Sequence, residues 1–336
     1  MSYDKRRTGR TVSFRSLYMV ALYAAILLAI IAAGLLWERR EQPETATFGS
    51  LNGRFDSDIS LAYGDEIVRY REYEITNYLF IGMDRDELTS AGYQNGGQAD
   101  FLMLLSVDRA NRTITPVMID RDTMTPVTTY GVFGNAAGTR TMQICLAHAF
   151  SGVDVSGSEN TAEAVSGLLG GVKIDRCLLM DLNGIVLLND AIGGVTVTLE
   201  DDLTALNPAL KKGATVKLTG DVAEHFVRGR MTVADGTNAS RMRRQEAYIE
   251  AMLDQLKEQM DGEGTILKKV FESLSGHVKT SVGQNVLIAE ADAYSTYDWN
   301  ELRTLPGTHG VGSDGFTEYW TDEQELMEMI VEIWFE

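Results

Sequence analysis

The sequence predicts an α/β fold, a mixed sheet sandwiched between helices, that follows one N-terminal transmembrane helix. Two observations support this: short apolar strand patterns alternate with amphipathic helical patterns, and one apolar run near the N-terminus is long enough to cross a bilayer. Of the 336 residues, 44% are hydrophobic, which is enough to form an ordinary buried core, and 23% are charged, as in an ordinary globular protein. This composition excludes the disordered, collagen-like and disulfide-scaffold classes.

The apolar run covers residues 17–37 and contains no charged residue. A helix of about 20 residues spans the hydrocarbon core of a membrane. Five basic residues precede the run, and Arg39 and Arg40 behind it are flanked by Glu38 and Glu41, so the positive-inside rule places the N-terminus in the cytoplasm. A cleaved signal peptide is the alternative, but the run exceeds the usual apolar region of roughly 7–15 residues, and a small-x-small cleavage site does not close it.

We therefore expect four parts in a single-pass protein of the cell membrane: a basic cytoplasmic arm (1–16), a signal anchor (17–37), an extracytoplasmic stalk with a short edge strand (38–75) and a large extracytoplasmic domain (76–336). Residues 38–336 hold 25 basic and 47 acidic residues. Because such a surface repels polyanions, we expect no nucleic-acid partner. The arm is also too short to build a nucleic-acid recognition fold.

Three strand patterns open the predicted extracytoplasmic domain, at 78–83, 101–107 and 113–119. The elements expected after them are helices at 141–150 and 160–169, a strand at 174–180, a helix at 182–191, a strand at 195–199, a long helix at 239–260 and a closing helix that starts near Asp322. Alternating strands and helices favour helices on both faces of the sheet.

Two acidic residues stand at neighbouring strand ends. Asp84 directly follows the first strand pattern, and Asp100 directly precedes the second. If these strands pair antiparallel, both carboxylates fall at one edge of the sheet. Mg²⁺ typically takes one or two carboxylates and completes its shell with water and substrate phosphate. The alternative is a pair of solvated strand ends.

Arginines are focused in two places of an otherwise acidic domain. Arg121 and Asp122 follow the third strand pattern, and a second group lies within 17 residues: Arg228, Arg230, Arg241, Arg243 and Arg244. Because a guanidinium grips phosphate oxygens bidentately, such a cluster indicates a specific anion site. A solvated helix face is the alternative for residues 241–244.

Other chemistry has weaker support. The sequence has no nucleophile elbow, HExxH, Walker loop or GxGxxG. We interpret His148, His225 and His309 as core or rim residues, and His277 lies at a helix end. Cys145 and Cys177 lie in apolar runs and are expected as buried free thiols, although an outward-facing domain could oxidise them if their Cα atoms lay within about 7 Å.

Taken in order, these segments resemble the LytR-CpsA-Psr family of wall-polymer transferases. The matching segments are LFIGMDRD (79–86), QADFLMLLSVD (98–108), ITPVMIDRDTM (114–124), LLMDLNGIVLLNDAIGGVTV (178–197), LTGDVAEHFVRGRM (218–231) and SRMRRQ (240–245). The resemblance implies an apolar tunnel for a lipid. It also implies a transfer reaction. A glycopolymer phosphate would move from a polyprenyl-diphosphate donor to peptidoglycan, and the glycopolymer would be wall teichoic acid or a capsular polysaccharide.

The resemblance also implies site residues. Asp84 and Asp100 would be the Mg²⁺-associated carboxylates, and the diphosphate would be held by Arg121, Arg228, Arg230, Arg241 and Gln245. Asp122 would lie beside Arg121 in the catalytic centre, where it could position an arginine or accept the proton of the acceptor.

The sequence departs from the family pattern at several positions. The usual SIPRD-like segment reads MIDRD, so Asp120 replaces proline and adds a negative charge near the phosphate site. Asp86, Asn238 and Cys145 also replace typical residues. The alternative function is a non-catalytic protein that binds polyprenyl phosphate or polymer, or that regulates the cell envelope. Such a binder should not need the two carboxylates.

Overall fold

The computed structural model describes residues 60–63, 66–85, 88, 97–131, 134–151, 156–229, 238–260 and 264–336. The predicted cytoplasmic arm, the predicted transmembrane helix, most of the predicted stalk and Arg230 lie outside these ranges. None of the helices in these ranges combines the length and the apolar character that crossing a membrane requires.

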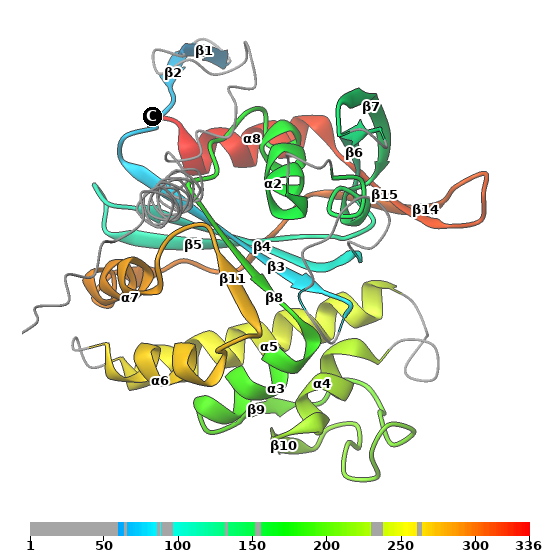
Figure 1. Cartoon of the computed structure of the whole chain (residues 1–336), viewed down its shortest axis with the longest axis vertical. Coiled ribbons are helices and arrows are strands. Elements are labelled where there is room, and N and C mark those ends of the chain that lie inside the picture. The colour runs from blue at the N-terminus through cyan, green and yellow to red at the C-terminus, as the bar shows by residue number, and fades with distance from the viewer. Residues whose placement is uncertain are drawn as a thin grey trace, which may run out of the picture. The chain divides into compact units, whose positions relative to one another are not determined.

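A mixed seven-stranded sheet forms the centre of the fold (Figure 1). Its strand order is β11-β8-β3-β4-β5-β12, with β13 also paired to β5. The strands are β3 (Ile75–Met83), β4 (Ala99–Asp108), β5 (Thr113–Ile119), β8 (Arg176–Met180), β11 (Val278–Thr280), β12 (Asp298–Trp299) and β13 (Arg303–Thr304). β3 pairs antiparallel with β4 and parallel with β8. The three strands predicted to open the domain are confirmed, and so is the mixed sheet.

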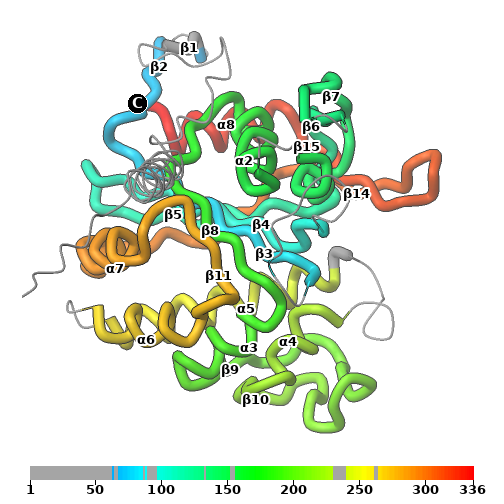
Figure 2. Tube along the Cα trace, viewed as in Figure 1, coloured from blue at the N-terminus to red at the C-terminus, as the bar shows by residue number. Residues whose placement is uncertain are grey.

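Helices cover both faces of this sheet, as predicted (Figure 1 and Figure 2). On one face, Leu79 and Ile81 of β3 pack in a cluster with residues of α2 (Gly157–Leu168) and α8 (Glu323–Trp334). Phe80 points to the opposite face, because successive side chains of a strand alternate. There it packs with residues of α3 (Leu182–Ala191), α5 (Asn238–Gln259) and α6 (Thr265–Ser273).

The remaining elements are short. They are the hairpins β1 (Ser60–Tyr63) with β2 (Glu66–Arg69), β6 (Met124–Tyr130) with β7 (Ala136–Gln143), β9 (Val195–Thr198) with β10 (Thr215–Leu218) and β14 (Gly307–Val311) with β15 (Thr317–Thr321), and the helices α4 (Asp221–Arg228) and α7 (Gln284–Ala293). β2 is the short edge strand expected before residue 76. It pairs with β1 in a separate hairpin rather than with the central sheet.

Local capping explains where several helices begin. Ser156 and Glu159 form a reciprocal capping box at the start of α2. Asp181 accepts the backbone N–H of Gly184 at the start of α3, and Asp322 accepts two backbone N–H groups at the start of α8. These side chains supply acceptors that the first turn of a helix otherwise lacks.

The predicted helix at 141–150 is wrong. β7 extends to Gln143, and a 3-10 helix of three residues follows, Ile144–Leu146. Thr139 and Thr141 favour a strand, and the pairing with β6 supplies hydrogen-bond partners that override the short helical pattern behind them. This hairpin brings Gln143 and Cys145 to the end of β5.

Candidate functional site

Asp84 and Asp100 lie at the same end of the adjacent strands β3 and β4, as the antiparallel pairing of these strands requires. Gly82 pairs with Phe101, but Met83 pairs with Ala99, so Asp100 is the extra residue of a β-bulge. A bulge changes the direction in which its extra side chain points. The Asp84 carboxylate accepts the backbone N–H of Gln98 at 3.0 Å, which closes the start of the loop between the two strands.

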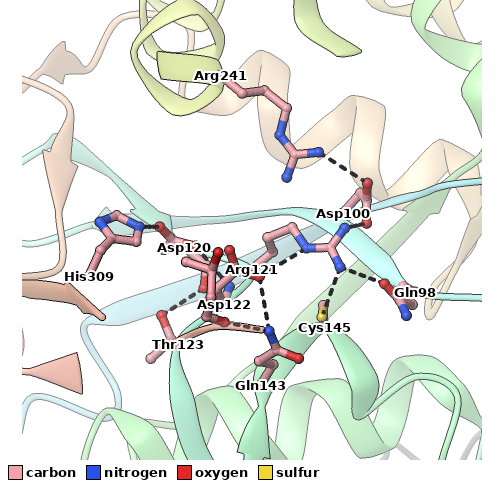
Figure 3. Close-up of polar contacts among 11 residues, drawn as sticks. Gln98, Asp100, Asp120, Arg121, Asp122, Thr123, Gln143, Cys145, Arg241 and His309 are labelled. Atoms are coloured by element: carbon pink, nitrogen blue, oxygen red, sulfur yellow. Dashed lines mark hydrogen bonds and ion pairs between the residues drawn. The ribbon is translucent and has the colours of Figure 1, made fainter. Parts of the chain in front are cut away.

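Two arginines flank the Asp100 carboxylate (Figure 3). Arg121 contacts Oδ1, and Nη1 of Arg241 lies 3.5 Å from Oδ2. Arg121 also donates hydrogen bonds to Gln98 and, at 3.4 Å, to Sγ of Cys145. The Arg241 side chain is 7% exposed, so its charge needs a partner inside the fold. Arg121 and Arg241 therefore meet on one carboxylate at the bulge.

Asp122 lies beside Arg121 and is almost fully buried. Its Oδ1 atom lies 3.4 Å from Nε of Arg121 and accepts a hydrogen bond from Gln143 at 3.3 Å. The backbone of this loop is held by Tyr319, whose N–H donates to the Asp122 carbonyl, and by Cys145, whose N–H donates to the Arg121 carbonyl. These contacts fix the direction of the Arg121 side chain.

The second arginine group divides into different environments. Arg228 ends α4, pairs with Glu224 at 2.5 Å and is half exposed. Gln245 donates to the carbonyl of Val227 at 3.2 Å, so α5 is tied to the end of α4. Arg230 lies outside the described residues.

The idea of a solvated helix face at residues 241–244 holds for Arg243, which is exposed, but is wrong for Arg241 and Arg244, which are buried. Arg244 donates to the carbonyls of Phe226, Gly229 and Ser240. It therefore fixes the start of α5 to the end of α4, a structural role that its position in the cluster did not indicate.

An apolar cavity of about 320 Å³ begins at these charged residues. Asp100, Arg228, Arg241 and Gln245 line it together with apolar side chains of the sheet and of α3, α5, α6 and α7. Along α5 the lining runs from Arg241 to Met260, which corresponds to about 28 Å at 1.5 Å per residue. A long apolar cavity that ends at buried arginines suits an amphiphile with an anionic head group.

Both cysteines are free and buried, as expected. Burial raises the pKa of the Cys145 thiol to about 12, and the nearby Arg121 guanidinium offsets only part of this effect. Burial likewise raises the pKa of the Cys177 thiol to about 12. Cys145 is thus a neutral thiol that contacts Arg121, rather than an anionic nucleophile.

Sequence reasoning missed three polar residues of this region: Gln98, Gln143 and His309. Gln98 and Gln143 contact Arg121 and Asp122, and Nε2 of His309 lies 2.6 Å from the buried Asp120 carboxylate. Gln143 and His309 belong to the hairpins β6–β7 and β14–β15, far from Asp120 in sequence. Gln98 lies in the matched segment QADFLMLLSVD, which was a signal that could have identified it.

Asp84 and Asp100 carry oxygen donors of the kind that a hard divalent cation takes, and arginines contact both oxygens of Asp100. Asp84 is exposed and Asp100 is partly exposed. Gln98 precedes Asp100 by two residues, and its amide oxygen accepts a hydrogen bond from Arg121. No group of three or more His, Cys, Asp or Glu side chains suited to a metal occurs within the described ranges. A pair of carboxylates is nevertheless the donor set with which Mg²⁺ binds when substrate phosphate and water complete its shell.

The comparisons with known proteins agree with this architecture. The model of the LytR_cpsA_psr family matches residues 55–333, so the chain belongs to that family. The polyisoprenyl-teichoic acid–peptidoglycan teichoic acid transferase TagU of Bacillus mycoides is 26% identical over 261 residues, which are 77% of this chain and 78% of that protein. TagV of Bacillus subtilis, named as the same kind of transferase, is 26% identical over 311 residues, or 88% of this chain and 71% of that protein.

Solved structures show the same fold. The protein gbs0355 of Streptococcus agalactiae superposes with a TM-score of 0.62 at 20% identity and covers 78% of this chain and 87% of that chain. A structure described as TagT bound to LI-WTA superposes with a TM-score of 0.58 at 18% identity and covers 77% of this chain and 89% of that chain.

Proposed function

We propose that the chain is a membrane-anchored, extracytoplasmic phosphotransferase. It moves a glycopolymer phosphate from a polyprenyl-diphosphate carrier to peptidoglycan. The glycopolymer is wall teichoic acid or a capsular or wall polysaccharide. The observation that carries this proposal is the apolar cavity that ends at Asp100 and Arg241, where Arg121 contacts the other oxygen of the Asp100 carboxylate. The names of the related teichoic acid transferases point to the same donor and acceptor.

In the proposed reaction the polyprenyl chain occupies the cavity and its diphosphate lies at the arginines. An acceptor hydroxyl of peptidoglycan attacks the phosphorus that carries the glycan, the bond from this phosphorus to the bridging oxygen breaks, and polyprenyl phosphate leaves with the proton of the hydroxyl on its released oxygen. Arg121, Arg228 and Arg241 stabilise the charge on the phosphate oxygens, and we assign the same role to Arg230, two residues after Arg228 in the sequence. Phosphoryl transfer depends mostly on such positioning and charge stabilisation, so a covalent nucleophile is not required.

Asp84 and Asp100 would hold Mg²⁺ in this site, and the cation would neutralise charge on the diphosphate. We assign Asp122 to positioning rather than to proton transfer, because its carboxylate is buried and faces Arg121 and Gln143. Gln245 supports the site by tying α5 to the carbonyl of Val227, next to Arg228.

The proposed location follows from the sequence. An anchor at residues 17–37 would hold the site close to a lipid donor, and the five basic residues before it favour a cytoplasmic N-terminus. The acidic outer surface repels nucleic acid, so an anionic donor would be held at the focused arginines rather than along that surface.

Arg228→Ala tests the anion site with little risk to the fold. The side chain is 52% exposed and pairs only with Glu224 in the described contacts, so the free energy of unfolding should change by less than about 1 kcal/mol. Transfer of glycan phosphate to peptidoglycan should fall at least 100-fold, roughly the effect of removing one charge-stabilising group. Arg303→Ala is the matched control, because Arg303 forms an exposed pair with Glu332. Full transfer by Arg228→Ala would contradict the assignment.

Asp84→Asn separates the transferase from the non-catalytic binding protein that the sequence left open. Asp84 is exposed, whereas Asp100 lies between two arginines and is a poorer choice for a variant. For a transferase, this variant should lose turnover yet still bind donor lipid. Unchanged biological effect together with unchanged lipid binding would favour the binding protein.

A further inference from the structure

The hairpin β14–β15 carries two large aromatic rings that the rest of the fold does not cover. The hairpin projects from the body of the domain beside β6–β7 (Figure 1 and Figure 2). Phe316 at its tip is 64% exposed, and Trp320 on β15 is 49% exposed. Single apolar side chains on a surface are normal, but apolar area that gathers on one short element marks an interaction surface.

The strand geometry places both rings on one face of the hairpin. Phe316, Glu318 and Trp320 follow each other at intervals of two residues, so their side chains point the same way. The N–H of Gly312 donates to the Phe316 carbonyl at 2.8 Å, so the pairing of the two strands extends to Phe316. Nε1 of Trp320 donates to Oε2 of Glu318 at 2.9 Å, which holds the indole beside the carboxylate. Phe316, Glu318 and Trp320 together form an aromatic row.

Glycines on the opposite strand leave the aromatic row open. Gly310 is the register partner of Glu318, and Gly312 lies opposite Phe316. A Cβ atom added to Gly312 would lie 2.4 Å from Oε1 of Glu318, so a side chain at this position would displace the carboxylate. Because neither glycine has a side chain, a ligand can approach the rings from the outer side of the hairpin.

A row of two rings with a carboxylate between them suits an uncharged chain of sugars. The C–H groups on the flat face of a sugar ring pack on the electron-rich face of an aromatic ring, and a carboxylate accepts hydrogen bonds from sugar hydroxyls. The rings lie four residues apart, about 14 Å along the strand, so a ligand that contacts both is an extended chain. Residues 306–336 contain eight acidic residues and no lysine or arginine, which disfavours an anionic polymer.

The aromatic row starts beside the turn that follows β5. Tyr319, the residue before Trp320, donates its N–H to the Asp122 carbonyl at 2.8 Å, and Gln143 donates to the Thr317 carbonyl at 2.6 Å. The Tyr319 side chain packs in the cluster on the α2 and α8 side of the sheet, whereas the apolar cavity lies on the α5 and α6 side. The hairpin and the cavity therefore reach the charged site from opposite faces of the sheet.

We propose that Phe316, Glu318 and Trp320 bind the glycan strand of the acceptor, peptidoglycan, whose sugar backbone is uncharged. In an in-line displacement the attacking and leaving oxygens lie on opposite sides of the phosphorus. The leaving polyprenyl phosphate occupies the cavity on the α5 side, so the acceptor hydroxyl arrives from the side on which the hairpin stands. This inference rests on the proposed function, because it names the surface that recognises the acceptor of that reaction.

Phe316→Ala, Trp320→Ala and the double variant test the proposal in the full chain, in detergent micelles. The probe is a soluble, uncharged oligomer of β-linked N-acetylglucosamine, which has the sugar backbone of peptidoglycan without its peptides, and calorimetry measures its dissociation constant. Tyr73→Ala is the matched control, because Tyr73 is an aromatic residue between β2 and β3 that is 75% exposed. Val311→Ala is a second control on the same hairpin, because Val311 alternates with Gly310 and Gly312 and so lies on the other face.

We expect each single variant to bind the oligomer at least fivefold more weakly, because aromatic side chains contribute strongly to binding surfaces. The double variant should bind more weakly still, and both controls should bind like the unaltered chain. In the transfer reaction, the single variants should raise the KM for peptidoglycan and leave the dissociation constant of the donor lipid unchanged.

Two results would overturn the proposal. One is equal binding of the oligomer by the double variant and the unaltered chain. The other is binding of a glycerol phosphate oligomer that depends on both rings, because this would assign the aromatic row to an anionic donor polymer.

An NMR titration of the unaltered chain tests the same surface without relying on altered affinities. The chain has 4 tryptophans, and the indole N–H signal of Trp320 is the one missing from Trp320→Ala. Saturating oligomer should shift this signal and leave that of the buried Trp334 in place, and an unmoved Trp320 signal would refute the inference. The titration needs no donor, so a chain that binds the oligomer at Trp320 but transfers no glycan phosphate would refute the proposed function alone.

Discussion

At the scale of single residues, the site depends on charged side chains that are buried beside compensating partners. Burial lowers the pKa of Arg121, but its neighbours Cys145, Asp100 and Asp122 raise it more, so the guanidinium stays charged. Asp122 and Gln143 fix the direction of this charge. Removing a member of the group takes one partner from another buried polar group, and a buried polar group left unsatisfied costs roughly 1–3 kcal/mol inside a protein.

The two thiols give a prediction at this scale. Burial raises the pKa of Cys145 and Cys177 to about 12, whereas an unfolded thiol titrates near 8.5, at about the value of a model peptide. The folded state therefore favours the protonated thiols. This stabilisation is complete below about pH 8.5 and is lost as the pH rises toward 12.

We expect the free energy of unfolding to fall faster above about pH 8.5 in the unaltered chain than in the Cys145→Ser, Cys177→Ser double variant, because only the former exposes ionisable thiols on unfolding. Urea denaturation at pH 7.5, 9 and 10 measures this difference. Equal slopes for both chains would show that the thiols are not buried in neutral form.

At the scale of elements, the sequence predicted those parts of the fold that local patterns determine. The strand patterns at 78–83, 101–107 and 113–119 and the helix at 182–191 agree with β3, β4, β5 and α3. Their ends also indicated Asp84, Asp100 and Arg121, because a strand end places its next residue at the edge of the sheet.

The rest of the candidate site depends on contacts between distant segments. Gln143 reaches Asp122 because β7 pairs with β6, and His309 reaches Asp120 because β15 is joined to Asp122 and Thr123. Neither the β6–β7 hairpin nor the β14–β15 hairpin shows a strong alternation of apolar residues, and β7 is largely exposed. Hydrophobic periodicity therefore could not reveal these hairpins in the sequence. The bulge at Asp100 is likewise a property of strand pairing and not of one strand.

Asn77 gives a prediction about how the elements are joined. This buried residue of β3 accepts the hydroxyl of Ser106 on β4 at 2.6 Å and the indole N–H of Trp334 on α8 at 3.0 Å, and it donates to the carbonyl of Lys173 at 2.8 Å. Asn77→Ala should lower the free energy of unfolding by about 2–4 kcal/mol, because it leaves buried polar groups unpaired.

Asn300→Ala is the control for this measurement. Asn300 is exposed and donates to Thr115 at 2.8 Å, so its loss should cost less than about 0.5 kcal/mol. Chemical denaturation compares the two variants. A similar small loss for both would mean that the Asn77 network does not hold β3, β4 and α8 together.

At the scale of the whole molecule, the proposed function requires that the cavity and the charged site together give the donor one orientation. Arg241 and Gln245 lie at the start of α5, and Leu256 and Met260 line the cavity near its end. In the proposed complex the head group lies at the strand ends of β3 and β4, and the lipid runs along α5.

Leu256→Trp tests this orientation. The larger side chain narrows the cavity far from Arg241, so a donor with a long polyprenyl chain should bind at least tenfold more weakly, while a donor with a short chain should bind normally. Leu256→Met, which conserves volume, should bind both. Dissociation constants for the two donors give the comparison. Equal weakening for short and long donors would contradict the proposed direction of the lipid.

The most direct test of the central claim follows the donor lipid itself. Full-length protein in membranes is incubated with Mg²⁺ and a polyprenyl-diphosphate glycan, with or without peptidoglycan, and the lipid is analysed by mass spectrometry. We predict that polyprenyl monophosphate appears when peptidoglycan is present, in equal amount to the glycan phosphate joined to the wall polymer. A diphosphate donor that binds but survives the addition of peptidoglycan would contradict transfer and identify a binding protein instead.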